Sequence, residues 1–171
     1  LVRDVAYGQL PKGRRADLHL RFADWVRALP GREEELIEIV AYHLEQSCLT
    51  ARAIARSPVT PPVLRAVDAL GRAAGKSERR EGYGEAERFY ARALALLDGE
   101  HAEVAADIRV RHGRALVALG ELRKAALELV SVAEDALVLG RSNVRGSALV
   151  ELADIDQRQG RPADGRRRPS P

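Results

Sequence analysis

The side chains that could carry chemistry are few and widely spaced. His19 and His43 lie well apart in the sequence on what we expect to be neighbouring helices, so their imidazoles could meet. A metal site needs further ligands at suitable spacing, and we therefore expect hydrogen-bonding roles beside Trp25 or Tyr42. Cys48 is the only cysteine and has no obvious base near it in the sequence, which predicts an inert, at least partly buried thiol.

Nucleotide chemistry is not encoded in these residues. The sequence contains no phosphate-binding loop of the form G-x-x-x-x-G-K-[ST] and no apolar strand that ends in acidic residues for Mg²⁺. The nearest glycine-rich run, Arg80-Glu-Gly82-Tyr-Gly84, lacks the lysine and is better explained as a turn. We predict no catalytic residue, no cofactor and no metal in this chain, and no enzymatic activity of its own.

The composition favours a helical core. Apolar residues make up 46% of the 171 residues but aromatic residues only 4%, so alanine and leucine dominate the interior. No apolar run approaches the roughly 18 residues of a membrane-spanning helix, and no secretory leader is recognisable. A lone cysteine is typical of a reducing compartment, and we expect a cytoplasmic location.

The net charge of +3 is concentrated at the carboxyl end. From Arg158 onward, five arginines face only one acidic residue, Asp164. This Arg/Pro/Ser/Gly segment cannot bury a core, and we expect residues 161–171 to be a disordered tail. A nucleic-acid site normally carries its basic charge on a folded face or along a helix, so a phosphate-binding tail is the poorer alternative.

Helical periodicity runs through most of the chain. We expect Phe22 and Trp25 to be core. Five apolar residues fall on one face of the first predicted helix, namely Leu18, Phe22, Trp25, Val26 and Leu29. Glu33 to Glu35 are expected in the first turn of the next helix, where the helix dipole favours carboxylates. The run Ser57-Pro-Val-Thr-Pro-Pro62 then marks an internal boundary.

The chain repeats itself after this boundary. The segment from Tyr83 to Leu94 aligns with the segment from Leu122 to Ala133, so that Ala86 matches Ala125, and Gly160 echoes Gly120 at nearly the same spacing. Small residues recur where two helices would approach closely, namely Ala86, Ala125 and Gly113. Internal repeats of this length predict a solenoid of helix pairs.

This pattern resembles the tetratricopeptide repeat over roughly Val67 to Gly160. The usual period is about 34 residues, so each unit here is about five residues longer, and Arg109 stands where a large apolar residue is expected. The third copy departs most, with Pro162 and Gly165 at positions that should pack. The predicted fold is all-α, a helical linker bundle followed by a tetratricopeptide-like α-solenoid. Its expected divisions are a linker at 1–57, repeats at 58–160 (about 67–105, 106–145 and a partial 146–165) and a tail at 161–171.

The amino-terminal third resembles a segment of bacterial STAND-type signal ATPases. The residues that carry this resemblance are Leu1-Val-Arg-Asp-Val-Ala-Tyr7-Gly-Gln-Leu-Pro11, Arg15-Ala-Asp-Leu18-His19, Ala23-Asp-Trp25 and Ala41-Tyr-His43-Leu-Glu-Gln46. In that family the segment follows the nucleotide-binding and winged-helix domains and leads into tetratricopeptide-like repeats. Relatives are often fused to class III adenylate or guanylate cyclases or to LuxR-type or SARP-type regulators. The resemblance implies a regulatory piece of a larger polypeptide, and the absence of methionine from the chain agrees with this interpretation.

The expected function is therefore a non-catalytic sensor and protein-interaction arm of a signal-transduction ATPase. We expect a protein or peptide on the concave repeat face, an intramolecular ATPase core in the parent protein, and neither a membrane nor a nucleic acid as partner. A free-standing repeat adaptor is the alternative, and a DNA-binding regulator that uses the basic tail is a third possibility. Eight charged residues are the candidates for partner binding: Arg72, Arg79, Asp107, Arg111, Arg114, Glu151, Asp154 and Arg158.

Overall fold

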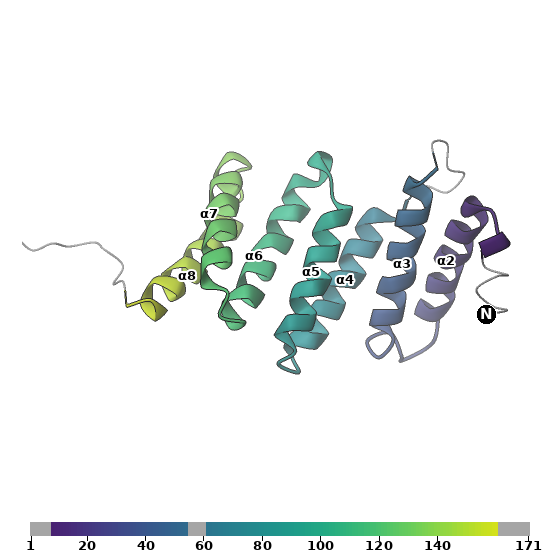
Figure 1. Cartoon of the computed structure of the whole chain (residues 1–171), viewed down its shortest axis with the longest axis horizontal. Coiled ribbons are helices and arrows are strands. Elements are labelled where there is room, and N and C mark those ends of the chain that lie inside the picture. Colours follow the sequence, from purple (N-terminus) through teal and green to yellow (C-terminus); the bar gives the residue numbers. More distant parts are fainter. Residues whose placement is uncertain (1–7, 55–60, 161–171) are drawn as a thin grey trace, which may run out of the picture. The chain divides into compact units, whose positions relative to one another are not determined.

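The computed structural model describes residues 8–54 and 61–160, and every regular element in these ranges is helical, as the sequence predicts. Contacts divide the chain into two compact units between Asp98 and Gly99. The first unit contains α2 (Lys12–Arg27), α3 (Ile37–Arg52), α4 (Val63–Glu78) and α5 (Tyr83–Leu96) (Figure 1). The second contains the short 3-10 helix η1 (Gly99–His101), α6 (Ala102–Ala118), α7 (Leu122–Val138) and α8 (Ser142–Arg158).

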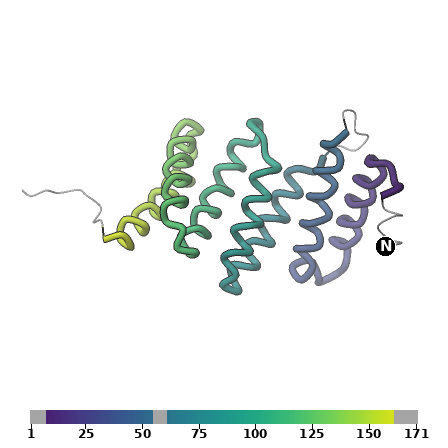
Figure 2. Tube along the Cα trace, viewed as in Figure 1, coloured from purple at the N-terminus to yellow at the C-terminus, as the bar shows by residue number. Residues whose placement is uncertain are grey.

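Within each unit, every α-helix packs against its neighbours in the sequence. In the first unit α2 contacts α3, α3 contacts α4 and α4 contacts α5, and in the second unit α7 contacts both α6 and α8 (Figure 2). Helix starts recur at the predicted spacing, since Val63 of α4 is followed by Ala102 of α6 and Tyr83 of α5 by Leu122 of α7. The described part of the chain is thus a helical-repeat-like all-α fold.

The division into units differs from the expected domain boundary. A boundary after residue 57 would separate α3 from α4, but these two helices pack together inside the first unit. Most of the Pro-rich run at 57–62 lies outside the described residues. The same holds for the expected disorder of 161–171 and for most of the Leu1–Pro11 stretch.

Small residues set the close approach between paired helices. Ala86 in α5 and Ala125 in α7 are fully buried, and Leu129, one turn after Ala125, is buried with it. A Cβ atom built on Gly113 of α6 would lie 2.8 Å from Cδ2 of Leu129. The prediction that Gly113 permits close packing is confirmed, because any larger residue would collide with a side chain that has no solvent to move into.

Left-handed glycines end the helices of the second unit. Gly120 and Gly140 have φ angles of 77° and 68°, which glycine adopts without a Cβ penalty. Beyond α6, the N–H of Glu121 donates to the carbonyl of Leu116, and the N–H of Arg141 donates to that of Ala136 beyond α7. These bonds satisfy carbonyls that the helix ends would otherwise leave unpaired.

Candidate interaction surfaces

Large side chains of α2 lie at the surface. Trp25 is 59% exposed, Phe22 40% and Leu18 38%, and the two aromatic rings contact each other with centroids 5.6 Å apart. The prediction that Phe22 and Trp25 belong to the core is therefore wrong. We call Leu18, Phe22 and Trp25 the α2 aromatic face.

The α2 aromatic face is exposed because α2 packs on α3 through a neighbouring stripe of small residues. Ala16 and Ala23 are fully buried and Val26 is 3% exposed, on a different side of the helix from the aromatic rings. The hydroxyl of Ser47 in α3 donates to the carbonyl of Ala16 at 2.9 Å, and this bond is buried. Such a close backbone approach is possible only where α2 presents small side chains, so the bulky ones are left outside.

Two histidines line the edge of this face. Nδ1 of His19 lies 2.8 Å from Nδ1 of His43, and the ring of His43 packs against Phe22 with centroids 4.3 Å apart. Tyr42 packs edge-on against both imidazoles. One imidazole must donate and the other accept, so the bond is lost when both rings are protonated. The prediction that these histidines have a hydrogen-bonding role beside Tyr42 is confirmed.

The environment of the histidine pair favours neutral rings. Burial, with the charges of His43 and Arg15, lowers the pKa of His19 below its usual 6.5, and burial also lowers the pKa of His43. An open, largely apolar hollow of about 410 Å³ lies beside the pair, lined by Leu18, His19, Arg21, Phe22 and His43. Its chemistry suits an apolar or aromatic side chain rather than a charged ligand.

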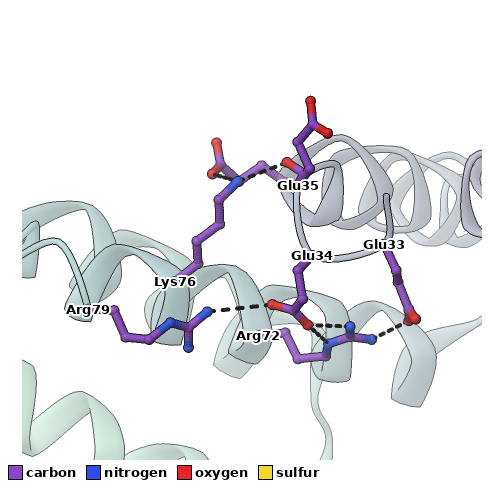
Figure 3. A network of polar contacts seen from close by, with 7 residues as sticks. Glu33, Glu34, Glu35, Arg72, Lys76 and Arg79 are labelled. Atoms are coloured by element: carbon purple, nitrogen blue, oxygen red, sulfur yellow. Dashed lines mark hydrogen bonds and ion pairs between the residues drawn. The ribbon is translucent and has the colours of Figure 1, made fainter. Parts of the chain in front are cut away.

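The acidic run before α3 does not start that helix. The first helical residue is Ile37, so Glu33, Glu34 and Glu35 lie in the preceding turn, and the expectation that they occupy the first helical turn is wrong. Figure 3 shows the carboxylates of Glu33 and Glu34 directed toward Arg72 of α4. Ion pairs across the unit, rather than the helix dipole, neutralise Glu33 and Glu34.

Arg72 is the centre of this network. Its guanidinium donates to Glu33 at 2.6 Å and to Glu34 at 2.5 Å, and Arg79 reaches the second oxygen of Glu34 at 3.5 Å (Figure 3). Lys76 bonds the carbonyl of Glu35 at 2.8 Å. The hydrogen bond from Arg72 lowers the pKa of Glu34, with smaller contributions from the neighbouring cations. Arg72 and Arg79 thus tie α4 to the turn that leads into α3.

A more buried ion pair joins α3 to α5. Arg92 donates to both carboxylate oxygens of Glu45, at 2.9 and 2.5 Å, and the Glu45 side chain is only 10% exposed. The hydrogen bonds from Arg92 to Glu45 raise the pKa of Arg92. A bidentate pair in this setting fixes the orientation of both side chains, and removal of one partner would leave a buried charge.

The predicted site residues of the second unit are also paired within it. Asp107 accepts from Arg141 at 3.0 Å, which ties α6 to the start of α8. Arg114 donates to Glu151 at 2.7 Å, again between α6 and α8. Asp154 and Arg158 form a pair at 2.8 Å along α8.

Arg111 is the exception among the eight candidates, because its side chain has no ion pair or hydrogen bond to another described residue. The other seven are each paired inside their own unit. Since most of these side chains are more than a third exposed, each pair contributes little stability in water. A partner that binds these charges would have to replace contacts that already exist.

In the described ranges the single thiol is shielded from solvent and no metal-ligand cluster is present. Cys48 is fully buried, and burial raises the pKa of its thiol to about 11. Among residues 8–54 and 61–160, no three histidine, cysteine, aspartate or glutamate side chains are grouped so as to hold a metal ion. Within the same ranges, no helix combines the length and apolar character needed to cross a membrane.

The sequence did not reveal the α2 aromatic face as a surface. The one available signal was that α2 carries two apolar stripes, one of large and one of small side chains, and only the stripe of small side chains allows α3 to approach.

Comparison with family models, with curated proteins and with solved structures gives no match for this chain.

Proposed function

We propose that this chain is a non-catalytic protein-interaction arm of a signal-transduction ATPase and that it docks through the α2 aromatic face. The observation that carries this proposal is the exposure of Trp25, the only tryptophan, next to Phe22. Tryptophan is among the residues that most often dominate the binding energy of interfaces. An aromatic patch beside an apolar hollow is the kind of surface that a partner protein covers.

The size of the patch favours a partner in the same polypeptide. Burial of a fully exposed large apolar side chain contributes about 1.5–3 kcal/mol, so the partly exposed Leu18, Phe22 and Trp25 together supply roughly 2–4 kcal/mol. Association of two separate proteins costs an estimated ~4–15 kcal/mol or more in lost freedom. A tethered partner avoids much of that cost because its effective concentration is high. An ATPase core in the same polypeptide would be such a tethered partner, and the resemblance of residues 1–50 to STAND-type proteins supports this choice.

Site-specific photo-crosslinking in the native host tests the proposal. A benzophenone side chain replaces Trp25, and in a matched control it replaces Arg88, an exposed α5 residue with no ion pair in the described residues. We expect crosslinks from position 25 to a segment of the same polypeptide that carries a phosphate-binding loop. The genomic reading frame upstream of Leu1 gives the independent check for that loop.

The same experiment separates the alternatives. Crosslinks to a protein without a phosphate-binding loop would support the free-standing adaptor. Equal crosslinking from positions 25 and 88 would contradict docking through the α2 aromatic face. DNA binding that is salt-dependent and lost on deletion of Arg166 to Arg168 would support the regulator instead.

A further inference from the structure

A second apolar surface lies between α7 and α8. Two adjoining hollows of about 250 and 210 Å³ share Leu137, Arg145 and Leu149. The apolar walls are open to solvent, since Leu137 is 60% exposed, Leu149 47% and Val130 46%. We call this surface the α7/α8 groove. It belongs to the second unit, whereas the α2 aromatic face belongs to the first.

A glycine in the groove has no explanation in the packing of its own unit. Gly146 lines the groove within α8, and a Cβ atom built there would meet nothing within 4 Å. Glycine inside a helix is destabilising relative to alanine, so its presence calls for a reason. Gly113 differs because Leu129 fills the space beside it. Gly146 instead leaves the backbone of α8 open to close approach from outside.

Two opposite charges stand at the groove without ion-pair partners among the described residues. Glu134 of α7 and Arg145 of α8 both line it, and neither side chain is paired there. Their neighbours Asp135 and Arg141 are both paired within the unit. A two-fold rotation can bring the acid of one such groove opposite the base of another, so the charges of this groove suit a second copy of the chain.

We propose that the α7/α8 groove binds the same groove of a second copy of this chain, with two-fold symmetry. Leu137 and Leu149 of each copy then pack over Gly146 of the other, and Glu134 of each copy faces Arg145 of the other. The interface buries the apolar walls and neutralises both charges at once. This arrangement goes beyond the proposed function, since it makes the second unit a self-association module.

The following segment of the chain does not have the chemistry to fill the groove. Residues 161–171 contain no valine, leucine, isoleucine, phenylalanine, tyrosine or tryptophan, and they contain three prolines. Their charge is strongly basic, which complements Glu134 but repels Arg145. A second copy supplies apolar side chains and both signs of charge.

The first test introduces bulk into the groove. Gly146→Leu places a side chain where a partner would approach, yet the Cβ position is open within the unit, so the fold is kept. Ser147→Leu is the matched control, because it adds the same side chain at an exposed neighbouring position that does not line the groove. Sedimentation equilibrium of the full chain should give a dimer for the wild type and for Ser147→Leu, and a monomer with unchanged helix content for Gly146→Leu.

The second test reverses the charges. Glu134→Arg and Arg145→Glu each juxtapose like charges twice in a symmetric dimer, so each alone should weaken self-association by more than about tenfold. A mixture of the two variants restores one of the two ion pairs and replaces the other with its charge-reversed equivalent. Native mass spectrometry with one copy mass-tagged should therefore detect a mixed dimer tighter than that of either variant alone.

A wild type that stays monomeric at all concentrations, or a mixed dimer no tighter than either variant alone, would overturn the proposal. A wild type that stays monomeric would indicate that a different protein or a further helix occupies the groove. Crosslinking from position 25 should be unaffected by Gly146→Leu, so failure here is distinguishable from failure of the proposed function.

Discussion

Gly113 and Leu129 illustrate how one atom decides the spacing of two helices. In Gly113→Ala the added Cβ meets a fully buried side chain at 2.8 Å, and overpacking of this kind costs about 1–3 kcal/mol. The gain in helix propensity of about 1 kcal/mol offsets part of this. We expect a net loss of roughly 1 kcal/mol in the free energy of unfolding, measured by urea titration followed by circular dichroism.

Gly75→Ala is the matched control in α4. Its new Cβ would meet only the end of the Arg79 side chain, at an ordinary 3.7 Å. The higher helix propensity of alanine then acts alone and should raise the free energy of unfolding by about 0.5–1 kcal/mol. A gain in stability for both variants would show that Leu129 can move aside.

The histidine pair predicts a pH dependence of stability. The pKa of His19 and that of His43 are lowered in the fold, so the unfolded chain binds more protons than the folded one as the pH falls below about 6.5. The contribution of the neutral pair to the free energy of unfolding is fully present above that pH. It is lost as the pH falls toward the lowered pKa values of the folded state. Urea titrations between pH 7.5 and 5 should therefore show decreasing stability.

His43→Gln should flatten this dependence, because it removes one titrating ring and the like charge that faces His19. His101→Gln, which changes a histidine outside the cluster, is the control. An unchanged slope in His43→Gln would contradict the assignment of the pH dependence to the pair.

At the scale of elements, the rate of Cys48 alkylation can report on the buried hydrogen bond between α2 and α3. The thiol is fully buried, and a pKa of about 11 leaves roughly one thiolate in a thousand at pH 8, so alkylation requires opening of the first unit around α3. Ser47→Ala removes the hydrogen bond to Ala16 and should cost about 1 kcal/mol.

Opening should therefore become about fivefold more frequent, and the rate of thiol alkylation should rise by the same factor. Ser142→Ala, at an exposed position in the second unit, should leave the rate unchanged. Fast alkylation of the native wild type would contradict the buried position of Cys48.

Elements differ in how far the sequence predicts them. The recurrence of helix starts and the buried Ala125 and Gly113 follow from local patterns that repeat along the chain. The packing face of α2 does not, because periodicity identifies two stripes and favours the more hydrophobic one, whereas the distance to α3 selects the smaller one. Ion pairs such as that between Arg72 and Glu34 join residues far apart in the sequence, so no local pattern indicates them.

At the scale of the whole molecule, the two units predict where the chain can be divided. Fragments 1–98 and 99–171 each keep their own packed helices, so we expect both to be helical and the longer to unfold cooperatively. A fragment of residues 1–57 is the control, because it loses α4 and the Arg92 partner of Glu45. Thermal melts that are equally cooperative for 1–57 and 1–98 would contradict the division at Asp98.

The left-handed glycines have a consequence for how such a chain can change over generations. Gly120, Gly140 and Gly160 follow one another at equal intervals, and α6, α7 and α8 all have the same length. A duplicated or deleted stretch of gene that encodes two such intervals would join one helix end to an equivalent one. The length of the array could then vary in whole helix pairs without any new loop having to evolve.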